Sequence, residues 1–425
     1  MHIYFSGIGG AGIGPLALIA HQAGFEVSGS DSQNSQYIDS LRKQGIRLHI
    51  GQTEAQIAKE HEMQPIDWIV FSSAVVIDNP NNEEMAFAKK HKIKISKRDE
   101  LLNSILEQKD LKLVAIAGTH GKTTTTALAV WLLKELDIPV SYSVGAKTIF
   151  GPMGQYNPVS KYFVYECDEF DRNFLSFEPE ISIITVVDWD HHDIYKTREE
   201  YKKAFRDFID QSHKTFIFKK DADYLGIKQS KSVTVLPDNG ELLEQIKLVG
   251  IHNRQNAKIA ISAVADITKK PLSELAKIAC KYPGSSRRFE KIANGIYSDY
   301  AHTPEEIKAT MQMARELSDN IVAVYEPLTN RRQHYMREQY QEVFKGAKKV
   351  YWLPSYLARE DPNLPVLTPE ELIKYLKDTD VKTSIKSPGL ARIIEKHAKD
   401  GDLVICMAGG GGGSLDEWLR EQFSK

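Results

Sequence analysis

Three apolar stretches, far apart in the chain, each run directly into a glycine-rich turn, and this pattern restricts the fold more than any other feature. The stretches are residues 2–5, 111–117 and 403–407. In α/β proteins, glycines at the carboxyl ends of parallel strands let the backbone approach a phosphate group. Other short apolar runs alternate with amphipathic stretches, which predicts an α/β fold with repeated strand–helix units and mostly parallel sheets. These runs are residues 68–71, 181–187, 215–218, 321–325 and 349–353.

The length of the chain predicts several domains. At 425 residues the chain is too long for a single core, and about three domains are expected. A polar stretch at residues 107–110 and a Pro-Gly-Ser-Ser stretch at 283–286 are the expected boundaries. We therefore expect a Rossmann-like domain over residues 1–107, a P-loop-type ATPase domain with a mostly parallel sheet over 108–284, and a second Rossmann-like domain over 285–425.

Net charge, hydropathy and cysteine content exclude several classes of protein. The formal net charge of −2 argues against a surface built to hold nucleic acid. No apolar run is long enough to span a bilayer, so no membrane partner is expected. The three cysteines cannot form a disulfide framework, and no signal peptide precedes the first strand. These features predict a cytoplasmic protein.

The first glycine turn has two functional interpretations. Gly7, Gly9 and Gly12 satisfy G-x-G-x-x-G after a strand, and Asp31 ends the next strand about 20 residues later. This fingerprint favours a nicotinamide-dependent dehydrogenase when taken alone. A helix N-terminus binds the phosphates of any nucleotide diphosphate by the same physics, however, so the nucleotide stays open.

The second turn, residues 118–123, predicts an ATP site. A strict P-loop has glycine where this chain has Ile116. The shorter Gly-Thr-His-Gly-Lys-Thr sequence keeps the essential parts, because its glycines expose N–H groups, Lys122 supplies an ammonium and Thr123 supplies a hydroxyl for Mg²⁺. An expected helix over residues 124–136 completes the strand–turn–helix context.

Two acidic clusters follow expected strands in the same domain. One is residues 166–169, and the other is residues 188–193, which also contains His191 and His192. Solvated charges would explain either cluster alone. Together with a phosphate turn they favour a hard divalent ion, Mg²⁺ with Mn²⁺ as an alternative, over zinc, because no cysteine stands at ligand spacing from the histidines.

The order of these motifs resembles the Mur ligase family along nearly the whole chain. The phosphate turn, the two acidic clusters and residues 250–257, which are similar to the H-N-x-x-N-A signature, occur in the family's order. Residues 287–290 and 299–305 continue the resemblance. The first glycine turn, residues 72–74 and residues 168–175 look most like the alanine-adding member.

The resemblance implies an ATP-dependent ligase that joins L-alanine to the carboxylate of UDP-N-acetylmuramate in peptidoglycan precursor synthesis. It implies that the N-terminal domain binds the UDP-sugar, the central domain ATP and the C-terminal domain the amino acid. The implied UDP-sugar residues are Gly7, Gly9, Gly10, Gly12, Asp31, Ser72 and Ser73. The implied ATP residues are Gly118, Thr119, His120, Gly121, Lys122, Thr123, Thr124, His252, Asn253, Asn256 and Arg288, and the implied metal ligands are Thr123, Glu166 and His191.

The implied chemistry assigns a few residues to catalysis. Attack of a carboxylate on the γ-phosphate of ATP gives an acyl phosphate, which an uncharged amine then attacks. Two anions meet in the first step, so Lys122, Arg288 and Mg²⁺ would offset their repulsion. His191 would act with the metal, and Asp299 or His302 is the expected base near the amine.

One stretch departs from the resemblance. Where the alanine-adding enzymes have a His-Arg-x-x-Arg type motif after a proline, this chain has Glu-Pro-Leu-Thr-Asn-Arg-Arg over residues 326–332. Arg331 and Arg332 would then hold the amino-acid carboxylate, because a guanidinium bonds both of its oxygens; a solvated basic loop explains them equally well. Glu-Pro-x-Thr-Asn is also similar to the recycling ligase, which attaches a murein tripeptide, so the peptide is the alternative substrate.

Two interpretations from other classes remain open at this stage. A nicotinamide-dependent dehydrogenase would leave the ATP and metal motifs unused. A non-catalytic nucleotide-binding regulator would have no use for Arg288, Asp299 and His302. The glycine run at residues 409–413 is consistent with a hinge, with close packing or with a third phosphate site, and its role stays open.

Overall fold

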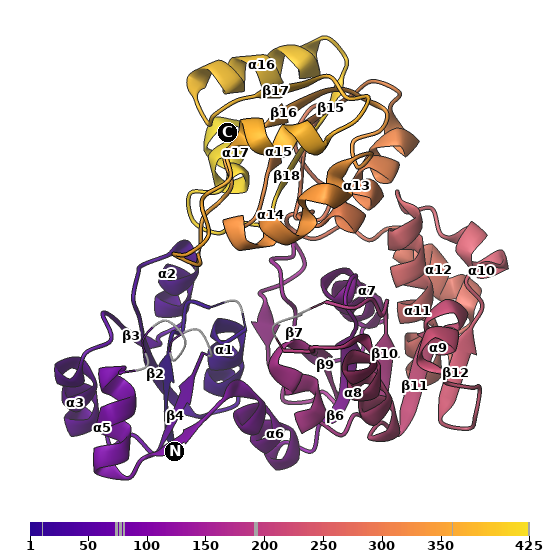
Figure 1. The fold of residues 1–425 in the computed structure, drawn as a ribbon. Helices are drawn as coiled ribbons and strands as arrows, with labels where there is room; N and C mark the ends of the chain where they lie inside the picture. Colours follow the sequence, from indigo (N-terminus) through magenta and orange to yellow (C-terminus); the bar gives the residue numbers. More distant parts are fainter. Residues whose placement is uncertain are drawn as a thin grey trace. The chain divides into compact units, whose positions relative to one another are not determined.

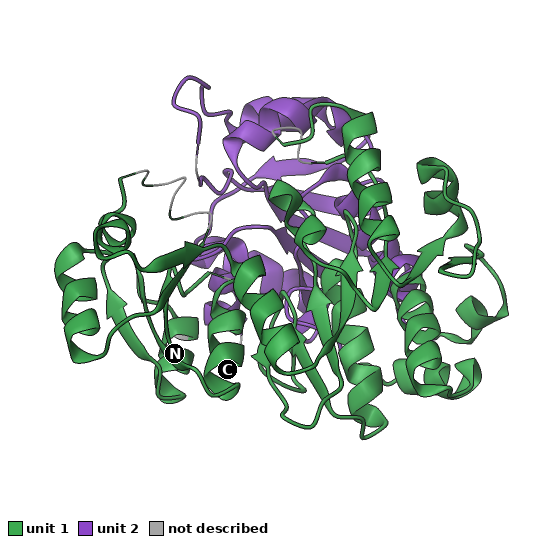
Figure 2. Ribbon diagram, turned by 90° about the horizontal axis from the view of Figure 1, so that it is seen from below, with its two compact units in different colours: residues 1–246, 255–283 green, residues 247–254, 284–425 purple. Residues whose placement is uncertain are grey.

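The structure, a computed structural model, divides the chain into two compact units (Figure 2). It describes residues 1–10, 12–72, 75, 79, 81–190, 194–358 and 360–423. Unit 1 comprises residues 1–246 and 255–283, and unit 2 comprises residues 247–254 and 284–425. The boundaries expected near residues 107 and 284 stay predictions. Within the described part of the chain, no helix is both long and apolar enough to cross a membrane.

Unit 1 begins with a fully parallel five-stranded sheet in the order β3-β2-β1-β4-β5, which is the Rossmann order (Figure 1). The order reverses between β1 and β4, so the glycine turn after β1 lies at the point where α/β sheets bind ligands. The strands are β1 His2–Ser6, β2 Glu26–Asp31, β3 Arg47–Ile50, β4 Trp68–Phe71 and β5 Lys94–Ser96, and the helices are α1 Gly14–Gln22, α2 Gln36–Lys43, α3 Glu54–Met63, α5 Glu83–His91 and α6 Arg98–Gln108.

A second sheet in unit 1 has the order β12-β11-β10-β6-β9-β7-β8 and is parallel except for the β7–β8 pair. Its central strand, β6, precedes the phosphate turn. The strands are β6 Lys112–Ala117, β7 Val140–Ser143, β8 Gly154–Gln155, β9 Tyr162–Glu166, β10 Ile181–Ile184, β11 Lys214–Phe218 and β12 Val233–Leu236. The helices are α7 Lys122–Glu135, η1 Phe170–Ser176, α8 Arg198–Asp210, α9 Lys219–Leu225, α10 Glu241–Gln245, α11 Ile251–Thr268 (whose residues up to 254 belong to unit 2) and α12 Leu272–Ala279.

The strand expected over residues 181–187 is shorter than the apolar pattern suggested. Strand β10 ends at Ile184, because the chain then turns to meet the phosphate turn through an antiparallel bridge between Val186 and His120. The Thr185 hydroxyl donates to the His120 carbonyl at 2.6 Å and fixes this change of direction. The expectation of a strand through residue 187 was wrong, because these apolar residues serve a turn-to-turn contact.

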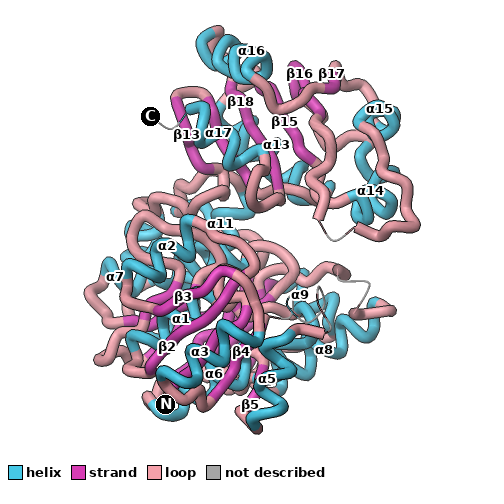
Figure 3. The backbone as a smooth tube through the Cα atoms, turned by 90° about the vertical axis from the view of Figure 1, so that its left-hand side faces the viewer, coloured by secondary structure: helices cyan, strands magenta, loops and turns pink. Residues whose placement is uncertain are grey.

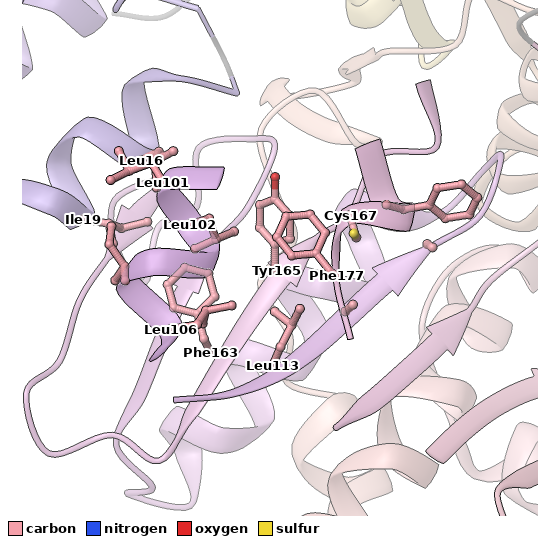
Figure 4. Packing of buried hydrophobic residues seen from close by; sticks show 14 of the residues in the cluster. Leu16, Ile19, Leu101, Leu102, Leu106, Leu113, Phe163, Tyr165, Cys167 and Phe177 are labelled. Carbon is pink, nitrogen blue, oxygen red and sulfur yellow. The ribbon is translucent and has the colours of Figure 1, made fainter. Parts of the chain in front are cut away.

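One apolar core joins the two sheets of unit 1 (Figure 4). Leu101 and Leu102 of α6 point into it from the N-terminal sheet's last helix, and Leu113 and Phe163 enter from strands β6 and β9. Cys167, just after β9, is also part of it, so the start of the first acidic cluster is anchored in the core. The two sheets therefore share buried surface and should be coupled in stability.

Unit 2 holds the third sheet, whose strands β13, β15, β16, β17 and β18 are labelled in Figure 3. Its order is β13-β14-β18-β15-β16-β17, and it is parallel except for the β13–β14 hairpin. Its strands are β13 Glu290–Ala293, β14 Ile296–Asp299, β15 Ile321–Glu326, β16 Ala347–Trp352, β17 Val381–Thr383 and β18 Leu403–Ala408. The helices are α13 Pro304–Leu317, α14 Asn330–Met336, η2 Arg337–Tyr340, α15 Pro369–Leu372, η3 Ile373–Tyr375, α16 Pro388–Lys399 and α17 Leu415–Phe423. The expected α/β class with mostly parallel sheets is confirmed.

Strand β15 shows why the strands of the third sheet have continuous apolar sequences. Ala323 and Tyr325 pack on the face covered by α13, whereas Val322 and Val324 pack on the face covered by α16 and α17. Both faces are buried, so no polar residue alternates with the apolar ones.

The glycine run after β18 is held through its carbonyl groups. Arg287 donates to the carbonyls of Ala408 and Gly410 at 2.7 and 2.8 Å. Tyr356 donates to Gly412 and Lys386 to Gly413, at 3.2 and 2.6 Å. The run is therefore a tethered turn between β18 and α17.

We predict that Leu102→Ala will lower the free energy of unfolding of unit 1 by about 2–5 kcal/mol, because it opens a cavity in the shared core. Its side chain is 1% exposed. The test uses two variants, one that keeps only Trp68 of β4 and one that keeps only Trp131 of α7 as the fluorescent probe in unit 1. In urea unfolding, Leu102→Ala should lower the transition midpoint by the same amount for both probes. The exposed Glu107→Ala on the same helix is the control. A shift seen by only one tryptophan would contradict the common core.

Candidate active site

The phosphate turn joins β6 to α7 around Gly121. This residue has φ 84° and caps the first helical residue, Lys122, so the helix starts two residues earlier than expected. A Cβ on Gly121 would lie 2.5 Å from Oδ1 of Asn256. Glycine is therefore needed both for the backbone conformation and for the close approach of Asn256, a residue expected at the nucleotide.

Hydrogen bonds tie the phosphate turn to the end of β10. The Thr119 amide donates to the Val186 carbonyl at 2.7 Å, and the Thr119 hydroxyl donates to the Asp188 carbonyl at 2.7 Å. The Thr119 hydroxyl also lies 2.8 Å from the hydroxyl of the buried Tyr201. The structure thus brings Asp188, the first residue of the second acidic cluster, beside the phosphate turn, as the sequence suggested.

Lys122 lies in a nearly closed environment and faces an acidic side chain. Its Nζ donates to Oε2 of Glu169 at 2.8 Å and to the Gly118 carbonyl at 2.6 Å. Burial by itself would lower the pKa of Lys122, but the carboxylates of Glu169 and Asp168 outweigh it and raise the pKa above its ordinary value. The ammonium therefore stays charged and suits an anionic ligand.

Thr123 and Glu166 meet on the other side of the helix start. The Thr123 hydroxyl donates to Oε1 of Glu166 at 2.8 Å, and the Gly145 amide donates to Oε2 at 2.8 Å. A hydroxyl and a carboxylate at this spacing, beside a phosphate turn, fit a hard divalent cation. The third expected ligand, His191, lies outside the described residues. Among the residues that are described, no group of three or more His, Cys, Asp and Glu side chains is placed to hold a metal ion.

The N-terminal turn brings its expected residues together. The amides of Gly7 and Ile8 both donate to the Ser30 carbonyl at 2.9 Å, and the Gly9 amide donates to Oδ2 of Asp31 at 2.8 Å. Asp31 therefore supports the turn itself, a role that the dinucleotide fingerprint does not predict. The Ser72 amide donates to Ser6 at the end of the neighbouring strand. Ser73 is outside the described residues.

Arg98 is a site residue that sequence reasoning missed. Its guanidinium fills the space beside Gly12 that a Cβ would occupy, and it lies 3.7 Å from Asp168. Its neighbour Lys97 pairs with Asp171, which has a left-handed backbone conformation at φ 54°. The start of α6 thus ties the N-terminal turn to the first acidic cluster. No motif marks it, because the link exists only once two sheets have packed.

The signature over residues 250–257 is divided between the two units. In unit 2, Arg254 pairs with Glu316 of α13 at 2.8 Å, and the Gly250 amide donates to the same carboxylate. These bonds lower the pKa of Glu316 to about 2, with the Arg254 hydrogen bond as the main cause. His252 and Asn253 share this first turn of α11, and Asn253 bonds the Val249 carbonyl.

In unit 2, Asp299 holds the loop that carries Arg288. The buried Asp299 carboxylate accepts from the amides of Phe289 and Ala301 and from the Thr310 hydroxyl, at 2.7, 2.9 and 2.9 Å. Burial raises its pKa, although Arg288 and these bonds oppose the shift. The Arg288 guanidinium lies 4.8 Å from the centre of the Tyr300 ring.

His302, the other expected base, lies close to Asp299 in sequence and is almost buried. Its Nδ1 lies 3.0 Å from the Tyr300 carbonyl and 3.0 Å from Oε2 of Glu306, and its ring meets the Tyr300 ring edge to face. The structure therefore places Arg288 and His302 on either side of the β13–β14 hairpin, both in contact with the ring of Tyr300, which follows Asp299 in sequence. The role of Asp299 or His302 as the base stays a prediction.

The expected amino-acid residues begin α14. The Arg331 amide bonds Glu360, and the Arg332 amide is capped by the Thr329 hydroxyl. Glu326, at the end of β15, is buried and pairs with Lys386 at 2.5 Å while accepting from the Leu415 amide. The glutamate that departs from the alanine-adding pattern therefore anchors the start of α17.

Three family descriptions match the chain in order. "Mur ligase family, catalytic domain" matches residues 2–110, "Mur ligase middle domain" matches 116–232, and "Mur ligase, glutamate ligase domain" matches 287–410. The chain belongs to the Mur ligase family. The dehydrogenase interpretation of the first turn is therefore not favoured.

Named relatives of this Mur ligase share nearly its whole length. UDP-N-acetylmuramate–L-alanine ligase of Caldicellulosiruptor bescii is 31% identical over 96% of this chain and 95% of that protein. The enzyme of the same name from Streptomyces coelicolor is 32% identical over 99% and 97%.

Solved structures agree on the fold. The UDP-N-acetylmuramate–alanine ligase of Thermotoga maritima superposes with a TM-score of 0.78 at 23% identity, covering 100% of this chain and 98% of that one. A murein peptide ligase from Psychrobacter arcticus has a TM-score of 0.65 at 20% identity, with coverage of 100% and 98%.

Asp221 is a second residue that the sequence did not reveal. It follows β11, is buried, and its Oδ1 accepts from the Val187 amide at 2.9 Å, so it supports the chain just before the second acidic cluster. Burial raises its pKa to about 6. The available signal was its position in the first turn of α9, shortly after β11 ends at Phe218, because the two acidic clusters also come soon after strands.

We predict that Asp221 gives unit 1 a pH-dependent stability. The unfolded carboxyl loses its proton near pH 3.8 and the folded one near 6, so stability falls by about 3 kcal/mol as the pH rises through this window. Asp221→Asn, which keeps an acceptor for Val187, should remove the slope. Urea unfolding from pH 4 to 7.5 measures it, with the exposed Asp223→Asn as control. An unchanged slope in Asp221→Asn would contradict the assignment.

Proposed function

We propose that this Mur ligase joins L-alanine to the carboxylate of UDP-N-acetylmuramate, with hydrolysis of ATP to ADP and phosphate. The observation that carries the proposal is the grouping of Lys122, Thr123 and Glu166 at one edge of the central sheet, in a chain that matches L-alanine ligases over almost its full length. This grouping suits the transfer of a phosphoryl group. Both ATP and nucleotide sugars are cytoplasmic compounds, so the proposed site of action is the cytoplasm.

Unit 1 is proposed to bind both nucleotides. The N-terminal turn, from Gly7 to Gly12 with Asp31, takes the UDP-sugar, and residues 118–124 with Asn256 take ATP. The shared core and the contacts of Arg98 support this division, because they fix one turn relative to the other. The domain limits proposed for these roles are residues 1–107 and 108–284.

Lys122 is proposed to perform the electrostatic part of the first step. The muramate carboxylate and the γ-phosphate are both anions, and a positive charge in a nearly closed site offsets their repulsion. A carboxylate oxygen forms a bond to phosphorus as the bond to the β-phosphate oxygen breaks, which gives an acyl phosphate and ADP. Mg²⁺, held by Thr123 and Glu166, would supply further charge neutralisation of the phosphates.

Unit 2 is proposed to bind the amino acid. Arg331 and Arg332 begin a short helix and are the candidates for its carboxylate. The amine attacks the acyl carbon, and phosphate departs. It carries away the carboxylate oxygen that attacked the γ-phosphorus in the first step. His302 or Asp299 would take the proton released by the amine. Arg288, held by the Asp299 loop, is proposed to contact the γ-phosphate.

We predict that phosphate release from ATP will require both UDP-N-acetylmuramate and L-alanine. A panel of amino acids and the murein tripeptide, each tested with a phosphate assay and mass detection of the UDP product, measures this. Release only with the tripeptide would replace L-alanine by the recycling substrate, which the Glu-Pro-Leu-Thr-Asn stretch at 326–330 keeps as the alternative. No release with any amine would reject the ligase.

We predict that Lys122→Ala will lower kcat by at least about 100-fold, because it removes a preorganised charge beside the phosphates. Steady-state phosphate release at saturating substrates measures the loss. Lys112→Ala, which removes an exposed lysine from the start of β6, the strand before the phosphate turn, is the matched control and should leave kcat unchanged. Equal rates in Lys122→Ala and the unmodified protein would contradict the proposed site.

A further inference from the structure

The first acidic cluster contains a carboxylate to which neither the sequence nor the proposed chemistry assigns a role. Glu169 is completely buried, and its Oε2 accepts from Lys122 Nζ at 2.8 Å. It lies three residues after Glu166, which faces Thr123 instead. The two glutamates of one short segment therefore reach two different residues of the same helix start.

Tyrosines hold Glu169 in place. The Tyr195 hydroxyl donates to the Glu169 carbonyl at 2.7 Å, and the Tyr201 hydroxyl lies 3.4 Å from Oε1. Tyr201 also bonds the Thr119 hydroxyl of the phosphate turn at 2.8 Å. Glu169 is thus connected to the phosphate turn directly through Lys122 and indirectly through Tyr201 and Thr119.

The chain on either side of Glu169 is also fixed. Cys167 is buried in the core of unit 1 (Figure 4), and Lys97 pairs with Asp171. Asp171 and Arg172 both have left-handed backbone conformations, which the surrounding contacts must maintain. A carboxylate held this firmly defines a fixed point for the lysine ammonium.

The ammonium of Lys122 has three donors, and the structure shows what they bond. One goes to Glu169, and the others face the carbonyls of Gly118 and Thr119 at 2.6 and 3.4 Å. Phosphate oxygens can replace the carbonyl contacts at little cost. Breaking the ion pair would separate a fully buried carboxylate from the ammonium that lies 2.8 Å away, which is strongly unfavourable.

We propose that Glu169 is a positioning residue that keeps its ion pair with Lys122 when ATP binds and so fixes where the ammonium meets the phosphates. This inference rests on the proposed ATP site. It has a second consequence, because a negative charge beside Lys122 repels the nucleotide. Glu169 therefore weakens ground-state binding of ATP while it aligns the lysine for phosphoryl transfer.

Glu169→Gln tests this combination. Removing the negative charge should tighten the Kd of MgATP roughly tenfold, by the loss of a nearby like-charge repulsion. The same variant should lower kcat by about 100-fold, because the ammonium is no longer aligned. Isothermal titration with MgATP gives the Kd, and phosphate release gives kcat. If Glu169 had only a structural role, its loss would weaken MgATP binding and lower kcat together. A weaker Kd combined with a lower kcat would therefore overturn the proposal.

Glu169→Asp separates charge from position. It keeps the negative charge but withdraws it by one methylene, so the Kd of MgATP should stay within about threefold of that of the unmodified protein while kcat falls. Unchanged kcat in this variant would overturn the proposal. Thermal unfolding shows whether Glu169→Gln folds. If it does not, the test rests on Glu169→Asp and on Tyr201→Phe, which should also lower kcat at unchanged Kd.

A matched control and an independent readout complete the design. Glu180→Gln removes the same type of side chain from an exposed pair with Lys112 and should change neither constant. The Kd of MgATP is measured without any amine or nucleotide sugar. A shift in Kd therefore reports on Glu169 even if the amine substrate proves to be the tripeptide, whereas absence of MgATP binding by the unmodified protein would reject the proposed ATP site and this inference with it.

Discussion

The order of three neighbouring strands, β10-β6-β9, is the constraint on which the candidate active site depends. Parallel strands end at the same edge, so the phosphate turn after β6 has the first acidic cluster on one side and Asp188, the start of the second, on the other. The bonds of Thr119 to Val186 and Asp188 close one side, and those of Lys122 to Glu169 close the other. Cation, hydroxyl and carboxylates are brought together by topology before any ligand binds.

The two proposed nucleotide sites of unit 1 are linked by packing that has no functional motif. Leu101 and Leu102 of α6 lie in the core that the two sheets share, and Arg98 at the start of the same helix lies against the N-terminal glycine turn. Helix α6 thus has one end in the core and the other between the N-terminal turn and the first acidic cluster, and it would hold the two proposed substrates in a fixed relative position. Positioning of this kind accounts for a large part of the rate advantage in bimolecular phosphoryl transfer.

Much of the fold followed from the sequence, because strands buried on both faces are continuous apolar runs and glycines mark their ends. The resemblance also implied Thr123 and Glu166 as metal ligands; the structure places the two side chains 2.8 Å apart, and their role as ligands stays a prediction. Arg98 and Asp221 were not found, because they lie in no motif and their roles depend on tertiary contacts. Asp31 was named from the fingerprint, but its bond to the Gly9 amide was not foreseen. The strand after Ile181 was predicted too long, since periodicity does not distinguish a strand from a buried turn.

The central proposed step is the attack of a carboxylate oxygen on the γ-phosphate before the amine reacts. Ligation of UDP-N-acetylmuramate labelled with ¹⁸O in both carboxylate oxygens tests it most directly, with mass spectrometry of the released phosphate. Attack by a carboxylate oxygen should leave one ¹⁸O in each released phosphate and one in each amide carbonyl. Phosphate without label, formed while the labelled sugar is converted to the amide, would contradict it.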